Sequence, residues 1–178
     1  MYTTPANTAP ADTTDYDQRQ ALFRAHARAV LCGDTTETAR LRHYIWPEHL
    51  LAHHAFSFAL FTTCVNDHFG EHLDWARLDL LTEHVRRTAP GLSPLKTEAL
   101  IRACYDEPHL LAEVPQAEHH AIIWTVCRTI TTSATSAGSG PVDLEDLFDR
   151  AEAIGRQIAQ GVFTAAQRYT WQPEPERP

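Results

Sequence analysis

The sequence predicts an all-α protein: a single-domain bundle of about six to seven helices around a buried central helix at about residues 48–68. Two observations carry this prediction. From Leu50 to Val65 there is no charged side chain if the histidines are neutral, and apolar residues fall at nearly every angle of a helical wheel, which is typical of a helix covered on all sides. Elsewhere apolar residues recur every three or four positions, and no stretch alternates as a β-strand does.

The ends of the central helix follow from three residues. Pro47 suits a first helical position, and Glu48 in the first turn would complement the positive end of the helix dipole. Gly70 can adopt the positive φ that closes the other end.

The segments before the central helix are a tail and two helices. Residues 1–14 are rich in Thr, Ala and Pro, a composition that predicts a disordered tail. A first helix should run from Asp15 or Asp17 to about Cys32, where Gly33 ends it. A short second helix should end before Pro47, and residues 15–133 together form the helical core.

Residues with short polar side chains mark the starts of the surrounding helices, because their oxygens can accept hydrogen bonds from the free N–H groups of a first turn. The predicted caps are Asp34 or Thr35, Asp74, and Ser93 followed by Pro94. The segment after Ser93 is expected to bury Leu95 together with Ala99 and Leu100.

The C-terminal part is predicted as a flexible linker at residues 134–142, a long amphipathic helix at residues 143–170 and a polar tail at residues 171–178. This helix should pack on the core or on a partner through its apolar stripe. The interaction residues we expect on the stripe are Phe148, Ile154, Ile158, Val162 and Tyr169.

Composition restricts the possible partners and the compartment. A formal net charge of -8 with one lysine argues against nucleic acid as a partner. No apolar run approaches the length that crosses a bilayer, and residues 1–15 lack the basic and apolar regions of a secretory signal, so we expect no export. The 4 cysteines form no Cys-x-x-Cys motif and are expected to be reduced core thiols, so we predict a cytoplasmic protein.

Histidine is the first candidate for chemistry. His49 and His53 lie one helical turn apart, as would His68 and His72 if the helix continued past Gly70, and such pairs can bind a transition metal. No His-Glu-x-x-His or Glu-x-x-His motif supports them. The broader hypothesis is a small-molecule or metal-binding protein with a histidine-lined pocket beside the central helix.

A second candidate is an arginine and a histidine separated by six residues, which occurs as Arg42 with His49 and as Arg102 with His109. This spacing is similar to that of the HEPN ribonucleases, in which dimerisation brings such pairs together over a phosphate, arginine stabilising charge and histidine moving protons. A proline interrupts each interval, so neither pair shares one continuous helix.

A third candidate is the acidic group at the start of the last helix, formed by Asp143, Glu145, Asp146, Asp149 and Glu152. Calcium loops place glycine among the liganding acids, whereas here the glycines precede them. An acidic first turn that complements the helix dipole is the simpler interpretation.

The leading functional prediction is a non-catalytic module that binds a protein partner or a second copy of itself through helix faces, without a cofactor. The sequence has no glycine-rich phosphate loop and no nucleophile elbow, which argues against the common enzyme classes. Tryptophans expected near the surface, such as Trp46, Trp75 and Trp171, are of the type that anchors interfaces.

Overall fold

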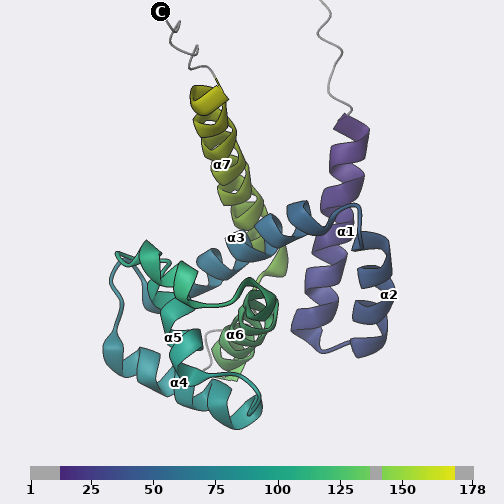
Figure 1. Ribbon diagram of the computed structural model, residues 1–178. Coiled ribbons are helices and arrows are strands. Elements are labelled where there is room, and N and C mark those ends of the chain that lie inside the picture. The colour runs from purple at the N-terminus through teal and green to yellow at the C-terminus, as the bar shows by residue number, and fades with distance from the viewer. Residues whose placement is uncertain (1–12, 137–141, 171–178) are drawn as a thin grey trace, which may run out of the picture.

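A computed structural model describes residues 13–136 and 142–170, with side chains for residues 15–133 and 142–157. In this part of the chain the protein is an all-α bundle of seven α-helices and one 3-10 helix, with no strand (Figure 1). None of the helices described is both long and apolar enough to cross a membrane. The elements are α1 (Thr13–Cys32), α2 (Thr35–Ile45), α3 (Leu50–Phe69), α4 (Trp75–Thr88), α5 (Pro94–Arg102), η1 (Pro108–Glu113), α6 (Gln116–Ser136) and α7 (Leu144–Thr170).

Helix α3 is the centre of the bundle. It packs mainly against α6 and α7, and α1 also contacts it (Figure 1). Leu60, Phe61 and Val65 in its middle have no exposed surface, which confirms the predicted buried helix. The first turn differs: Leu50 and Leu51 are exposed, because this turn borders a cavity instead of a neighbouring helix.

The start of α3 is later than predicted. Residues 46–49 form a turn in which the His49 amide donates to the Ile45 carbonyl, and the helix begins at Leu50. Glu48 therefore lies outside the helix and does not complement its dipole. The predicted end is confirmed, since Gly70 has a φ of 82° and its amide bonds to the Asn66 carbonyl.

The predicted caps are confirmed at three helices. The Asp34 side chain accepts from the Glu37 amide, the Asp74 side chain accepts from the amides of α4, and Ser93 caps α5 with Pro94 at its first position. Leu95 is the exception to the burial pattern that follows Ser93, because it lies in the first turn of α5 with 78% of its surface exposed.

Helices α1 and α2 form an antiparallel pair joined at Gly33 (Figure 1). Gly33 has a φ of 76°, and a Cβ atom there would lie 2.9 Å from the guanidinium of Arg128 on α6. The positive φ therefore favours glycine at this position, and a larger residue would also have to displace the end of the Arg128 side chain. The turn brings α2 back along α1 to the region where α3 begins.

The first turns of α7 pack inside the bundle. Leu147, Phe148 and Ala151 are buried, and Gly155 faces Ala59 of α3 at a distance that leaves room for little more than a methyl group. Phe148 is therefore a core residue of this chain, and the prediction that it contacts a partner is wrong. Ile154 is half-buried.

Several predicted features lie at the limits of the described residues. Helix α6 continues to Ser136, so the first residues of the predicted 134–142 linker are helical; no glycine or proline interrupts the sequence before Gly138. Residues 137–141, most of the 1–14 tail and the 171–178 tail are outside the described residues. So are the side chains of Ile158, Val162 and Tyr169.

The 4 cysteines are free but do not all belong to the core. Cys64 and Cys127 are buried, Cys104 is half-buried, and Cys32 is exposed at the end of α1, contrary to the prediction of core thiols. Burial raises the pKa of the Cys104 thiol to about 11, so this group stays protonated at neutral pH.

Candidate functional site

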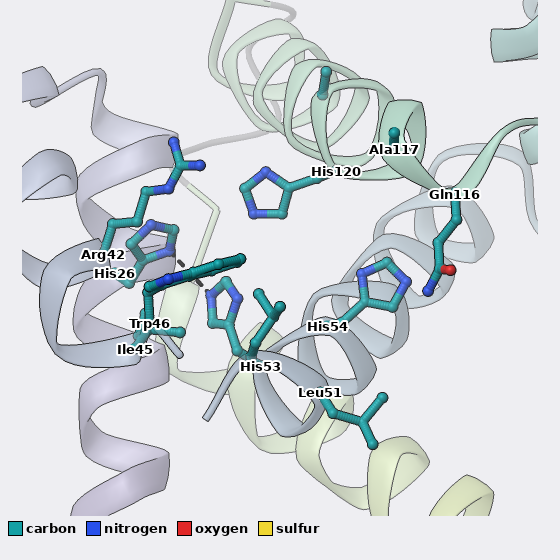
Figure 2. Close-up of a pocket in the computed structure, with 12 residues that line it drawn as sticks. His26, Arg42, Ile45, Trp46, Leu51, His53, His54, Gln116, Ala117 and His120 are labelled. Carbon is teal, nitrogen blue, oxygen red and sulfur yellow. Dashed lines mark hydrogen bonds between the residues drawn. The ribbon is translucent and has the colours of Figure 1, made fainter. Parts of the chain in front are cut away.

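A cavity of about 590 Å³ lies between α1, α2, α3 and α6 (Figure 2). Its volume is within the range of small-molecule sites. Among the residues whose side chains the structure describes, the lining contains histidine, one arginine, one glutamine and apolar side chains, and no aspartate or glutamate. The lining residues are His26, Arg42, Ile45, Trp46, Leu50, Leu51, His53, His54, Gln116, Ala117, His120 and Ala121.

The floor of the cavity is a pair of buried histidines from different helices. Nδ1 of His26 on α1 and Nε2 of His53 on α3 lie 3.2 Å apart and share one hydrogen (Figure 2). The two residues are 1% and 3% exposed. Burial, the dominant cause, lowers the pKa of His26 to about 4 and that of His53 to about 3, so both imidazoles are neutral at pH 7.

His120 on α6 has a defined tautomer. The indole Nε1–H of the buried Trp124 donates to Nε2 of His120 at 2.9 Å. An accepting nitrogen carries no hydrogen, so the neutral ring of His120 must carry its hydrogen on Nδ1. Burial and the charge of Arg42 lower the pKa of His120, which keeps this neutral form at pH 7.

His54 lies on another wall of the cavity, across from Gln116 (Figure 2). Its ring stacks on that of His119, with the centroids 6.1 Å apart. Nε2 of His119 donates to the Val114 carbonyl at 2.9 Å. Burial and His119 lower the pKa of His54 as well, so the lining histidines share a neutral state.

Of the described residues that line the cavity, Arg42 is the one that is formally charged when the histidines are neutral. Its side chain extends from α2 toward the ring of His120 (Figure 2). It makes no side-chain hydrogen bond or ion pair with any of the residues whose side chains the structure describes. Arg24, by contrast, contacts Asp149 and Glu152.

The mouth of the cavity is apolar. Trp46 and Leu51 are 58% and 81% exposed, and Leu50 is also exposed. Ala117 and Ala121, one turn apart on α6, form the opposite wall with only methyl groups. The cavity therefore combines a polar floor with apolar sides.

The predicted metal ligands do not converge. His49 and His53 lie at one end of α3 and His68 at the other; the helix has 20 residues and is about 30 Å long. His72 follows Gly70, which ends the helix, so it shares no face with His68. Within the described ranges no three His, Cys, Asp or Glu side chains are placed to hold a metal ion.

The predicted pairing of Arg42 with His49 is not formed. The turn that contains Pro47 separates them: the His49 ring packs near that of Phe23, with centroids 6.4 Å apart. Arg42 instead affects the pKa values of His26 and His120, which come from α1 and α6.

Arg102, the second predicted arginine, is neutralised within its own segment. Its guanidinium bonds to Glu98 at 2.9 Å and to Glu107 at 2.7 Å, and it lies 5.4 Å from the ring centroid of Trp75. His109 lies in η1, after Pro108. This arrangement leaves no free arginine beside His109.

The acidic group of α7 has structural partners instead of a calcium ion. Asp143 caps the helix by accepting from the amides of Glu145 and Asp146. Arg24 on α1 contacts Glu145, Asp149 and Glu152, and Arg28 also pairs with Glu145. These contacts join α1 to α7.

The sequence pointed to His53 but not to its hydrogen-bonding partner His26. His26 falls on the same helical face as Phe23 and Ala27, so its position on the apolar stripe of the first helix was a signal for a buried histidine. His120 likewise precedes Trp124 by one turn. No local pattern indicated that these helices meet at His53.

Comparisons of this chain with protein-family models, with curated proteins and with solved structures found no match. The class that the fold and the site define is an all-α bundle with a histidine-lined cavity between four of its helices.

Proposed function

We propose that this protein binds a small organic molecule in the cavity between α1, α2, α3 and α6. The observation that carries the proposal is the guanidinium of Arg42, which has no partner among the described side chains and borders a cavity of about 590 Å³. Ligand sites in helical bundles commonly occur between helices and combine apolar walls with a few polar groups.

The neutral histidines fit this role. A neutral imidazole offers one N–H donor and one acceptor, so it can orient a ligand without adding charge to the site. His26 and His53 use one nitrogen each on one another, which fixes their rings as a rigid floor. The walls formed by Leu50, Ala117 and Ala121 can cover the apolar part of a ligand.

The test is native mass spectrometry of the full chain after gentle purification, followed by thermal-shift screening with a library of small organic molecules. We expect a retained mass or a rise in melting temperature. Ala121→Trp, which fills the cavity, should abolish the effect. Ala153→Trp on the exposed face of α7 is the matched control and should preserve it.

Two outcomes would contradict the proposal. One is that no library member binds or raises the melting temperature of the wild-type protein. The other is that a molecule binds equally well to the wild type and to folded Ala121→Trp, which would place its site elsewhere.

A second candidate function is a helical interaction module, and the exposure of Trp46, Leu50 and Leu51 at the cavity mouth favours it. A contiguous apolar surface of this kind often marks a protein interface. Sedimentation equilibrium over a wide concentration range tests self-association. A dimer that Leu51→Ser dissociates would support self-association through this surface, and a monomer at all concentrations would exclude it. The nuclease hypothesis has no comparable support, because Arg102 is bound by Glu98 and Glu107.

A further inference from the structure

We infer that the ligand carries a negatively charged group, bound by the guanidinium of Arg42 and by the Nδ1–H of His120, and an apolar body that contacts the walls near Trp46 and Leu51. This inference rests on the proposed function, because it names the chemical class of the molecule that the same cavity would hold.

The first argument is the distribution of charge. The chain has 23 acidic residues and a net charge of -8, yet no carboxylate among the described side chains lines this cavity. Arg24, Arg102 and Arg150 each bond to at least two carboxylates. Arg42 has no such partner among the described residues, so the formal charge that the described lining residues bring to the cavity is positive.

The second argument is the direction of the donors. Trp124 fixes the hydrogen of His120 on Nδ1, and Figure 2 shows the side chain of Arg42 extending toward the His120 ring. Two N–H donors from α2 and α6 therefore border the same space. An anionic acceptor such as a carboxylate or a sulfonate can bond to both, and hydrogen bonds to a charged group are stronger than those between neutral groups.

The same geometry disfavours a cation or a metal ion. Arg42 would repel it, and no carboxylate in the described lining compensates for that repulsion. The facing nitrogens of His26 and His53 are occupied by each other, and Nε2 of His120 is occupied by Trp124. These three nitrogens are therefore not available to a metal ion while the hydrogen bonds are in place.

A matched pair of fluorescent probes tests the inference. Anilinonaphthalene sulfonate and phenylnaphthylamine share an aromatic framework, but only the first is an anion. We expect the sulfonate to bind the folded wild-type protein about tenfold more tightly than the neutral probe at low salt, and high salt should reduce the difference.

The variants assign the preference to named groups. Arg42→Gln should remove most of the sulfonate preference, since hydrogen bonds to a charged group account for about a tenfold difference in affinity. The affinity for the neutral probe should stay within about twofold of the wild-type value. Arg42→Lys should retain part of the sulfonate preference. Arg40→Gln is the matched control, because Arg40 is also on α2 but pairs with Glu37 and does not line the cavity. Circular dichroism of each variant verifies that the probes report on folded protein.

The outcomes separate this inference from the proposed function. If phenylnaphthylamine binds, Ala121→Trp blocks it, and the sulfonate shows no preference that depends on Arg42, the cavity binds ligands but the inference of an anion is overturned. If neither probe binds the wild type, the cavity is not a site for such molecules and the proposed function loses its support as well.

Discussion

Two regions of this protein use arginine in opposite ways. At the interface of α1 and α7, Arg24 contacts the three carboxylates of Glu145, Asp149 and Glu152, and its side chain is 24% exposed. At the cavity, Arg42 faces histidines and no carboxylate among the described residues. The first arginine joins two helices, whereas the second has no carboxylate partner among the described residues and is the group to which we assign the proposed ligand.

The contacts that support the cavity also differ from those at the α1–α7 interface. The buried contacts on its floor are made by neutral histidines that bond to one another and to Trp124, so the structure does not depend on a charged pair there. Ion pairs between helices occur instead at the α1–α7 interface. We therefore expect mutations at the interface to change stability and mutations at the cavity to change binding.

The largest expected effect is from Phe148→Ala at the interface of α7 with the core. Phe148 has no exposed surface, so its loss should reduce the free energy of unfolding by about 3–5 kcal/mol through lost burial and a residual cavity. Urea denaturation measures this. An unchanged unfolding midpoint would show that α7 does not belong to the bundle.

The second prediction concerns pH at the cavity floor. His26 and His53 have pKa values of about 4 and about 3 in the folded protein, whereas the unfolded chain binds protons near pH 6.5. Stability should thus be complete above pH 6.5 and fall as the pH drops below it, by about 2 kcal/mol per histidine at pH 5. Urea denaturation between pH 7.5 and pH 5, where most carboxylates remain ionised, measures the slope.

The control for this pH dependence is His53→Gln, which retains a hydrogen-bonding partner for His26 but removes one titrating group. The slope of the unfolding free energy against pH below pH 6.5 should decrease by an amount that corresponds to about one bound proton. The histidines with more modest pKa reductions, His54 and His120, act in the same direction and remain in the variant. Equal wild-type stability at both ends of the range would show that the floor is not buried.

The third prediction concerns Arg24, whose removal should lower the free energy of unfolding. Arg24→Gln leaves Asp149 and Glu152 without their shared cation, and we expect a loss of about 1–2 kcal/mol, a value kept small because solvent screens this partly exposed cluster. High salt should reduce the loss, as urea denaturation at two ionic strengths would show. If Arg40→Gln, which removes an exposed pair within α2, costs as much, the interface contact has no special role.

The smallest expected effect on stability is at the cavity mouth. Arg42→Gln and Leu51→Ser should each change the free energy of unfolding by less than about 0.5 kcal/mol, because both side chains are exposed and Arg42 has no described side-chain partner. The same denaturation experiment measures it. A loss comparable to that of Arg24→Gln would contradict the distinction between the two arginines.

Local signals predicted the helices well. Asp34, Asp74 and Ser93 cap helices as expected, and Gly70 ends α3, because a cap depends on a residue and its near neighbours in the chain. The prediction placed the start of α3 too early because Pro47 and Glu48 are compatible with a first turn, but here they belong to the turn that leads back from α2.

The candidate site was predicted only in part. The sequence indicated a histidine-lined pocket beside the central helix and included His53 and Arg42, but it paired each with His49. That pairing followed from spacing along the chain. The actual neighbours of these residues, His26 and His120, come from helices far away in the sequence, and spacing carries no information about such contacts.

The sequence by itself determined the all-α class, the position of the buried helix and most helix ends, because periodicity and capping are properties of neighbouring residues. Only the tertiary structure decided that Phe148 lies inside the bundle, that Arg24 is neutralised and that Arg42 is not. Burial and charge pairing depend on which helices meet, and that is settled by the packing of the whole chain.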